Sequence, residues 1–401
     1  MKTLFIILFI FPISLFSQSL DSLLKIAETQ NLLIASQSAL INASKEKIIQ
    51  DGVLDNPTIS VSGQKDMLIT SGRQMIPWFG TLKAMKNVAK AESEISVSEL
   101  EVIKNELFFQ IKKSYFELTK IHQDIFWMEK NIDFLRKIES LLLEQYKSNK
   151  ISRTELVRLQ MQIRQEESKL MSMKEMIQPI TFQINQLLNR DLTKSITIED
   201  TTLKTFSTIV GFDTLWKKNP VFEVLESEKN MLKAQEKLIG YERKPQWMVG
   251  VDIGYVTIPM RATEHGDKEY ETMNILMPMI GANIPIYSKK KNDAKINELK
   301  WKNEALEKEL LQMQKEFEVK IVETVWKKND AERRIALNDF QLNQTEKLID
   351  LMLSEYATGM INFSEILQMY VMLTMYQTEK NKAIFDYKIS IAELEKIKGV
   401  K

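Results

Sequence analysis

The sequence predicts a mainly helical, internally duplicated chain that contributes four β-strands to a transmembrane β-barrel. Three observations predict this class. The same order of segments occurs twice, and each copy contains one uninterrupted stretch long enough for a helix of roughly 100 Å. Each copy also contains a pair of short segments with the alternation of β-strands.

Matching residues that keep their order along the chain define the two copies. The matches are Asn31 with Asn219, Pro57 with Pro245, Ile76-Pro77 with Ile284-Pro285, and Tyr146–Leu156 with Tyr356–Ile366. The predicted organisation is a first repeat over 18–190, a connector over 191–212 and a second repeat over 213–401. Within the repeats, we expect hairpins at 57–79 and 246–286 and helix-tip turns at 146–153 and 356–363.

The first repeat begins after a predicted signal peptide over residues 1–17. Lys2 precedes an apolar run, and small and polar residues follow it. The expected elements are then a helix at Leu20–Gln50, a strand at Thr58–Ser62, a turn at Ser71-Gly72, a return strand at Gln74–Phe79, a helix at Leu82–Lys147 and a helix at Thr154–Leu188. The long helix is predicted because its stretch lacks proline and glycine and its apolar residues recur in coiled-coil steps of three and four.

The second repeat shows the same pattern with a longer hairpin. The expected elements are a helix at Asp213–Glu242, strands at Gln246–Ile258 and Thr272–Ile286, a helix at Lys289–Glu355 and a last helix that reaches Ile397. Asn149 and Gly359 occupy equivalent positions between helices, and both residue types tolerate the left-handed conformation at a helix C-terminus. Ser152 and Asn362 follow them and are predicted to cap the next helix.

The bulk composition excludes several classes of protein. The 401 residues include 55 basic and 54 acidic side chains, which argues against a nucleic-acid binder. There is no cysteine, so disulfides and thiolate chemistry are excluded. The two histidines, His122 and His265, accompany no HExxH, phosphate-loop or GxSxG motif, so we expect neither an enzyme nor a cofactor. The 21 methionines admit a cuprous-ion site, but methionine is more often flexible core filler.

The strand at 246–258 predicts a barrel that several copies share. One face carries Trp247, Val249, Val251, Ile253 and Tyr255, and the other carries Gln246, Gly250, Asp252 and Gly254. In lipid no strand edge can remain unpaired, and membrane barrels begin at about eight strands. Four strands from one chain therefore require strands from other copies, and Asp252 is predicted to face the barrel lumen.

Several segments together resemble TolC-like outer-membrane efflux proteins over essentially the whole mature chain. They are Asn56-Pro57, Gln74–Gly80, Ile284–Lys290 and the paired tip turns, and the Pro77–Gly80 stretch is most similar to the heavy-metal efflux branch. The resemblance implies a homotrimer with a twelve-stranded barrel in the outer membrane of a Gram-negative-type bacterium and a twelve-helix periplasmic tunnel. It also implies a periplasmic adaptor and an inner-membrane pump, which we expect to be of the RND type.

The resemblance also implies a periplasmic gate at the helix tips. Glu365 matches the first acidic position of the constriction, and Gln368 stands at the second. Tyr356 and Glu155 match a tyrosine–carboxylate pair, while Ile361 replaces the family's arginine. The alternatives are that Glu365 is a solvated surface residue and that Tyr356 packs as the last core residue of its helix.

Adaptor contact is expected at the two tip turns. The residues are Ser148, Asn149, Ile151, Thr358, Gly359 and Ile361. The predicted function is a passive outer-membrane conduit for drugs, metal ions or other small molecules. Two alternatives remain open, namely a soluble periplasmic coiled-coil scaffold or adaptor and the outer channel of type I protein secretion.

Overall fold

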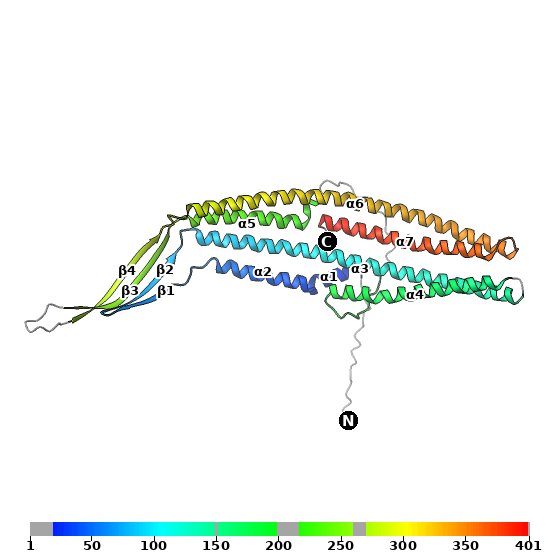
Figure 1. Cartoon of the computed structure of the whole chain (residues 1–401), viewed down its shortest axis with the longest axis horizontal. Helices are drawn as coiled ribbons and strands as arrows, with labels where there is room; N and C mark the ends of the chain where they lie inside the picture. The colour runs from blue at the N-terminus through cyan, green and yellow to red at the C-terminus, as the bar shows by residue number, and fades with distance from the viewer. Residues whose placement is uncertain (1–18, 149–150, 199–215, 260–269, 400–401) are drawn as a thin grey trace, which may run out of the picture. The chain divides into compact units, whose positions relative to one another are not determined.

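The computed structural model describes residues 19–148, 151–198, 216–259 and 270–399 (Figure 1). The first repeat contains α1 (Leu20–Gln30), α2 (Leu32–Gln50), β1 (Thr58–Gln64), β2 (Met67–Ile76), α3 (Thr81–Lys147) and α4 (Arg153–Leu187). The second contains α5 (Pro220–Glu242), β3 (Gln246–Pro259), β4 (Tyr270–Asn283), α6 (Lys289–Ala357) and α7 (Phe363–Lys398). The predicted signal peptide, most of the connector and Asn149 lie outside the described residues.

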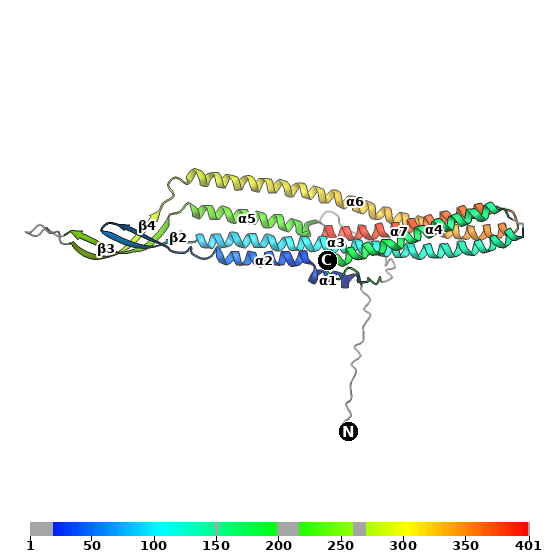
Figure 2. The same ribbon diagram turned by 60° about the horizontal axis from the view of Figure 1, so that its bottom comes forward.

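The chain divides into two compact units. The tip unit comprises Met1–Ala35, Ile103–Lys217 and Phe317–Lys401, and the sheet unit comprises Ser36–Val102 and Lys218–Glu316. Helices α3 and α6 run without a break through residues of both units, with 67 and 69 residues. In the tip unit α4 lies along α3 and α7 lies along α6 (Figures 1 and 2). Among the described residues no helix combines the length and hydrophobicity that a membrane span requires.

The predicted single helix over Leu20–Gln50 is wrong, because Asn31 divides it. Asn31 has an extended backbone (φ −66°, ψ 133°), and its Oδ1 accepts the backbone N–H of Leu33 at 2.8 Å. Its Nδ2 donates to the carbonyl of Leu187 at 2.7 Å. Asn219 has nearly the same backbone (φ −68°, ψ 131°) and caps α5 by accepting the N–H of Val221 at 3.0 Å. The matched asparagines thus share one role, which is to begin a helix.

The four strands form one antiparallel sheet in the order β1-β2-β3-β4, so β1 and β4 are its edges. The register pairs Asp252 of β3 with Ser71 of β2 and with Met277 of β4. We call the side of the sheet that Asp252 shares the inner face, and the side of Ile253 the outer face. Exposure alternates along β3 as the two faces require, with Ile253 55% exposed and Asp252 half-buried.

The predicted turn at Ser71-Gly72 is also wrong. Both residues lie in the middle of β2, and the chain reverses at Lys65-Asp66 instead. β2 pairs along its whole length with β3 and over seven positions with β1. Ladder hydrogen bonds on both sides therefore outweigh the local turn preference of serine and glycine.

Gly254 of β3 leaves no room for a side chain beside β2. A Cβ atom on this residue would lie 2.1 Å from the carbonyl oxygen of Leu68, which is closer than any real side chain tolerates. Around Gly72, by contrast, a Cβ would meet nothing within 4 Å. Glycine is therefore required at 254 by the backbone of the neighbouring strand.

Candidate functional site at the helix tips

The tip of the α6–α7 pair is closed by a left-handed glycine, as predicted. Gly359 has φ +78°. Its N–H donates to the carbonyl of Tyr356 at 3.0 Å, and the N–H of Met360 donates to the carbonyl of Glu355 at 3.0 Å. These two bonds form a Schellman motif, which satisfies carbonyls at the end of α6 and reverses the chain into α7.

The two predicted capping residues lie at the expected N-cap positions, but their side chains do not cap the helices. Ser152 and Asn362 occupy the N-cap positions of α4 and α7 with extended backbones. Neither side chain makes a capping hydrogen bond. The start of α7 is instead fixed by packing, because Phe363 and Ile366 in its first turn are buried.

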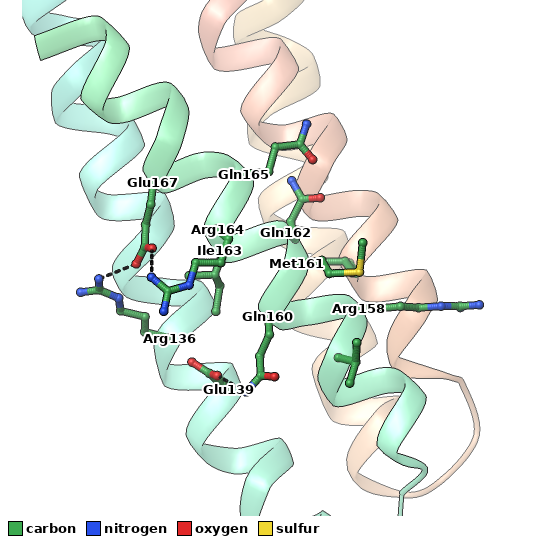
Figure 3. Close-up of a pocket in the computed structure, with 12 residues that line it drawn as sticks. Arg136, Glu139, Arg158, Gln160, Met161, Gln162, Ile163, Arg164, Gln165 and Glu167 are labelled. Carbon is green, nitrogen blue, oxygen red and sulfur yellow. Dashed lines mark hydrogen bonds and ion pairs between the residues drawn. The ribbon is translucent and has the colours of Figure 1, made fainter. Parts of the chain in front are cut away.

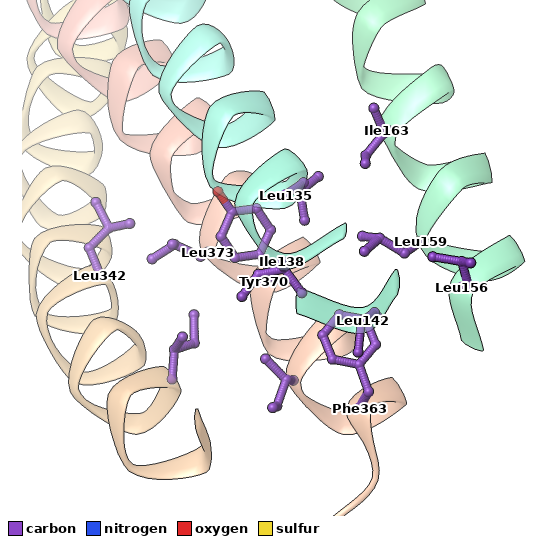
Figure 4. Close-up of a cluster of buried hydrophobic side chains, with 12 residues drawn as sticks. Leu135, Ile138, Leu142, Leu156, Leu159, Ile163, Leu342, Phe363, Tyr370 and Leu373 are labelled. Atoms are coloured by element: carbon purple, nitrogen blue, oxygen red, sulfur yellow. The ribbon is translucent and has the colours of Figure 1, made fainter. Parts of the chain in front are cut away.

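A hydrophobic cluster, the tip core, joins α3, α4, α6 and α7 within the tip unit (Figure 4). Its buried members are Leu135, Ile138 and Leu142 from α3, Leu156, Leu159 and Ile163 from α4, Leu342 and Ile349 from α6, and Phe363, Ile366, Tyr370 and Leu373 from α7. Leu159 is fully buried and Ile366 is 1% exposed. Ile151 and Ile361, predicted as adaptor contacts, are partly buried and pack against this core.

Tyr356 of α6 forms its hydrogen bond with α3 and not with Glu155 of α4. Its hydroxyl donates to Oε1 of Gln145 at 2.7 Å, and its ring meets Phe363 edge-on at 5.9 Å. Burial, and secondarily the charge of Glu155, raises the pKa of the Tyr356 hydroxyl. The predicted tyrosine–carboxylate hydrogen bond is therefore absent within the described chain, and Gln145 takes the place of the carboxylate.

The other predicted tip residues lie at the surface. Glu365 and Gln368 are exposed one turn apart on α7, on the side away from the buried Ile366. The hydroxyls of Ser148 and Thr358 donate back to the carbonyls of Glu144 and Glu355, at 2.9 and 2.8 Å. All four side chains are thus free of the tip core, and a partner or a second copy can approach them.

A buried layer of polar side chains lies next to the tip core and was not predicted from the sequence. Asn131 of α3 donates through Nδ2 to Oγ1 of Thr374 at 3.1 Å and to Oε1 of Gln377 at 3.0 Å, and the Tyr370 hydroxyl donates to the Asn131 carbonyl at 3.1 Å. The sequence gives no clear signal for this layer, because Ile132 already fills the apolar position between Met128 and Leu135 and Asn131 lies beside it. Satisfied polar groups at this level fix the register of α7 against α3.

A groove of about 1150 Å³ between α3 and α4 was also not predicted from the sequence (Figure 3). It is lined by Arg136, Glu139, Val157, Arg158, Gln160, Met161, Gln162, Ile163, Arg164, Gln165, Glu167 and Leu367. Glu167 accepts from Arg136 at 2.7 Å and from Arg164 at 3.0 Å, and the bond from Arg136 holds the pKa of Glu167 below its usual value. Both charge signs and exposed apolar side chains, including Met161 at 68%, are available to a partner in this groove.

Helix α6 carries an exposed apolar stripe in the tip unit. Its members recur at helical spacing and are Val319, Val322, Trp326, Leu337, Phe340, Leu348 and Leu351. Each is between 43% and 68% exposed. On α4, Val157, Met161, Met171 and Met176 are also exposed. Exposed apolar side chains that share one helix face favour an interaction site there.

The fold is that of solved outer-membrane channels. CusC, described as undergoing conformational changes on folding and transmembrane channel formation, matches with a TM-score of 0.79 and 12% identity over 96% of this chain and 93% of its own. The outer-membrane protein VceC of Vibrio cholerae matches with 0.75 and 14% identity over 95% and 96%. The open state of the MtrE channel of Neisseria gonorrhoeae matches with 0.73 and 12% identity over 95% and 89%. No family model matches the sequence, and no curated protein matches it.

The predicted TolC-like fold is therefore confirmed, with helical repeats and a four-stranded sheet in each chain. All five predicted residues belong to the tip unit and lie near helix ends, Glu155 at the start of α4, Tyr356 and Thr358 at the end of α6, and Glu365 and Gln368 in the first two turns of α7. Asp252 lies in the other unit, on the inner face of the sheet. Its Oδ1 is buried and accepts no hydrogen bond from any residue that the structure describes.

Proposed function

We propose that the protein is a passive outer-membrane conduit of a tripartite export system. The observation that carries this proposal is the sheet, which has a lipid-like outer face and two unpaired edges. Trp247, Ile253 and Tyr255 on β3 and Leu276 and Ile280 on β4 are all exposed, from 39% to 80%. In a bilayer the edges β1 and β4 must be paired, so β4 of one copy is expected to bind β1 of the next.

Self-assembly also accounts for the apolar stripe of α6. A head-to-tail interface pairs two different surfaces and closes into a ring when the rotation allows it. We propose that the α6 stripe of one copy packs against an exposed helical face of its neighbour, and that three copies complete a twelve-stranded barrel. The structural similarity to outer-membrane channels supports this number of copies.

The tips are proposed to form the periplasmic gate and the docking site of the adaptor. Three copies of Glu365 around one axis would repel anions and attract cations, and Gln368 would leave the second level uncharged. The α3–α4 groove, with its ion-paired Glu167 and its exposed Met161, would receive the helical end of a periplasmic adaptor. Export energy would come from an inner-membrane pump.

The function is tested by reconstituting the purified full-length protein in planar bilayers. We expect discrete single-channel currents that prefer cations, because the proposed constriction carries three carboxylates. Membrane fractionation of the host provides a second measurement. A protein recovered in the soluble periplasmic fraction, with no channel activity, would favour the scaffold alternative instead.

Replacing Tyr356 with phenylalanine is expected to loosen the tip. The change deletes the hydroxyl that bonds Gln145, at a cost of about 1 kcal/mol, and keeps the ring packed on Phe363. Single-channel conductance should rise, and Gln145→Leu should have the same effect. Tyr146→Phe is the control, because Tyr146 is 37% exposed and makes no hydrogen bond among the described residues. Unchanged conductance in Tyr356→Phe would remove this residue from the gate.

A further inference from the structure

A cavity of about 460 Å³ between α3 and α5 of the sheet unit, the lysine cavity, carries a surplus of positive charge. One acidic residue, Glu94, lines it together with four lysines. The lysines are Lys83 and Lys90 of α3 and Lys233 and Lys237 of α5. None of the four forms an ion pair with a residue that the structure describes, whereas Lys229, Arg243 and Lys295 of the same unit do. Their ammonium groups are therefore available to an anionic ligand.

Helical spacing places these lysines around one hollow. The two lysines of α3 are seven residues apart, which is two turns, and those of α5 are four residues apart, which is one turn, so each pair shares a helix face. The residues beside them are small. Ala84 and Ala91 are 6% and 7% exposed, and Ala234 lines the cavity from α5. Alanine leaves space that a longer side chain would fill, and Asn87 and Asn230 add amide groups to the lining.

The lysine cavity lies at the level where the membrane would end. β3 and β4 have 14 residues each, and strands of that length, tilted by about 45°, span the roughly 30 Å of a hydrocarbon core. Phe79 and Tyr287, 81% and 96% exposed, follow the ends of β2 and β4, and aromatic residues are typical of a membrane–water interface. Gly80, next to Phe79, lines the cavity together with Tyr241. The first lysine of α3 is three residues further, about 5 Å, and a headgroup layer is about 5–8 Å thick.

The handedness of the chain determines on which side of the sheet unit the cavity opens. Gly72 pairs with Val251 and so belongs to the outer face. Its carbonyl oxygen lies 2.7 Å from where a Cβ of Gly250 would stand, so this carbonyl points toward β3. In a strand of L-residues, the chain direction and the face of a residue together fix the side to which its carbonyl points. With the outer face toward the viewer and the turn at 65–66 uppermost, β3 therefore lies to the left of β2.

The helices of the sheet unit follow the same order. α2, α3, α5 and α6 lie side by side in the order of the strands (Figures 1 and 2), so in this view α5 is to the left of α3 and α2 is to its right. Ser98 of α3 hydrogen-bonds with α5, and Ser93 hydrogen-bonds with α2. On a right-handed helix that runs downward, the arc between these two serines that faces the viewer contains Lys83 and Lys90. The lysine cavity therefore opens on the side of the outer face, and not on the side of the inner face.

We propose that the lysine cavity binds the phosphate headgroup of an anionic phospholipid, with Lys83, Lys90 and Lys237 as its ligands. Ammonium groups donate charge-assisted hydrogen bonds to phosphate oxygens, and clustered lysines at a membrane surface attract anionic lipids. Inorganic phosphate has the same chemistry, but a lipid is already concentrated at this surface because its chains remain in the bilayer. The inference rests on the proposed function, because it takes the outer face of the sheet to contact lipid.

The test identifies the lipids that stay bound to the purified full-length protein. Equal amounts of dioleoyl-phosphatidylglycerol and dioleoyl-phosphatidylcholine are added in detergent, and bound lipid is measured by native mass spectrometry. We expect phosphatidylglycerol to be retained preferentially. The triple variant Lys83→Gln, Lys90→Gln and Lys237→Gln should lower that preference about tenfold or more. All three lysines are exposed and glutamine is a good helix former, so the fold should be kept.

The matched control is Lys289→Gln, Lys290→Gln and Lys291→Gln at the start of α6. It removes the same charge at the sheet end of a helix but leaves the lining of the lysine cavity intact. We expect it to lower the preference by less than about threefold, because exposed lysines outside a cavity are screened by salt. Equal losses in the two variants would indicate general attraction to a basic surface and would overturn the site. An absent preference in the wild type, or displacement of the lipid by inorganic phosphate, would overturn it as well.

Bilayer currents separate this inference from the conduit proposal. They are recorded on the same preparations in membranes of phosphatidylcholine alone. Currents without any lipid preference would reject only the lipid site. A preference that depends on the lysines of the cavity, without currents, would reject only the conduit.

Discussion

Leu276→Lys will prevent the protein from assembling in the membrane, whereas Met277→Lys will not. These neighbours lie at the middle of β4 on opposite faces of the sheet, and both are exposed, Leu276 at 69% and Met277 at 44%. On the outer face a lysine at the bilayer midplane costs about 2–4 kcal/mol for each chain. On the inner face the same lysine meets water and stands opposite Asp252.

The two variants are compared by membrane fractionation and by the size of the detergent-extracted assembly. Because the introduced residue is the same, differences in net charge and strand propensity cancel. If both lysines are tolerated equally, the outer face does not contact lipid and the barrel is wrong. If both prevent assembly, position along the strand rather than the face is decisive, and the assignment of inner and outer faces fails.

Leu159→Ala will destabilise the tip unit by about 2–5 kcal/mol, the usual cost of removing a buried leucine side chain. Leu159 is fully buried where α4 meets the tip core (Figure 4). The loss should be local, so amide hydrogen exchange should accelerate in α4 near Leu156 and Ile163 and in the α3 segment that packs on them. A loosened tip should also raise single-channel conductance.

Val157→Ala is the control for this change, since Val157 is 41% exposed on the same helix. Its effect on stability should stay within about 0.5 kcal/mol. Similar exchange rates in the two variants would mean that the tip core does not hold α4. Val157 also lines the α3–α4 groove, so a selective loss of adaptor binding in its variant would instead support docking there.

The long helices and the strands of the second repeat were predictable because each rests on a repeated pattern. The stretch without proline and glycine in α3 favours one uninterrupted helix, and its apolar steps identify the buried side. The alternation from Trp247 to Tyr255 likewise identifies two faces. Such patterns combine many weak preferences, so a single unusual residue does not alter the outcome.

The errors fall where one residue decides the structure. The helix expected over Asp213–Glu242 begins instead at Pro220, after the N-cap Asn219. The matched Asn31 precedes Leu32, so no proline marks the helix start there. Ser71-Gly72 has the composition of a turn, and only its two partner strands keep it extended. The partner of Tyr356 could not be predicted either, because the choice of Gln145 over Glu155 depends on how two distant helix ends are packed.

The contrast between Gly254 and Gly72 bears on how this protein can diverge. At 254 any substitution forces β2 and β3 apart, so related sequences that keep this sheet should retain glycine there even where flanking positions vary. At 72 the space is open, and larger residues can be accepted without moving the backbone. We therefore expect the two glycines to differ in conservation. An alignment of related sequences should show glycine retained at 254 and other residues accepted at 72.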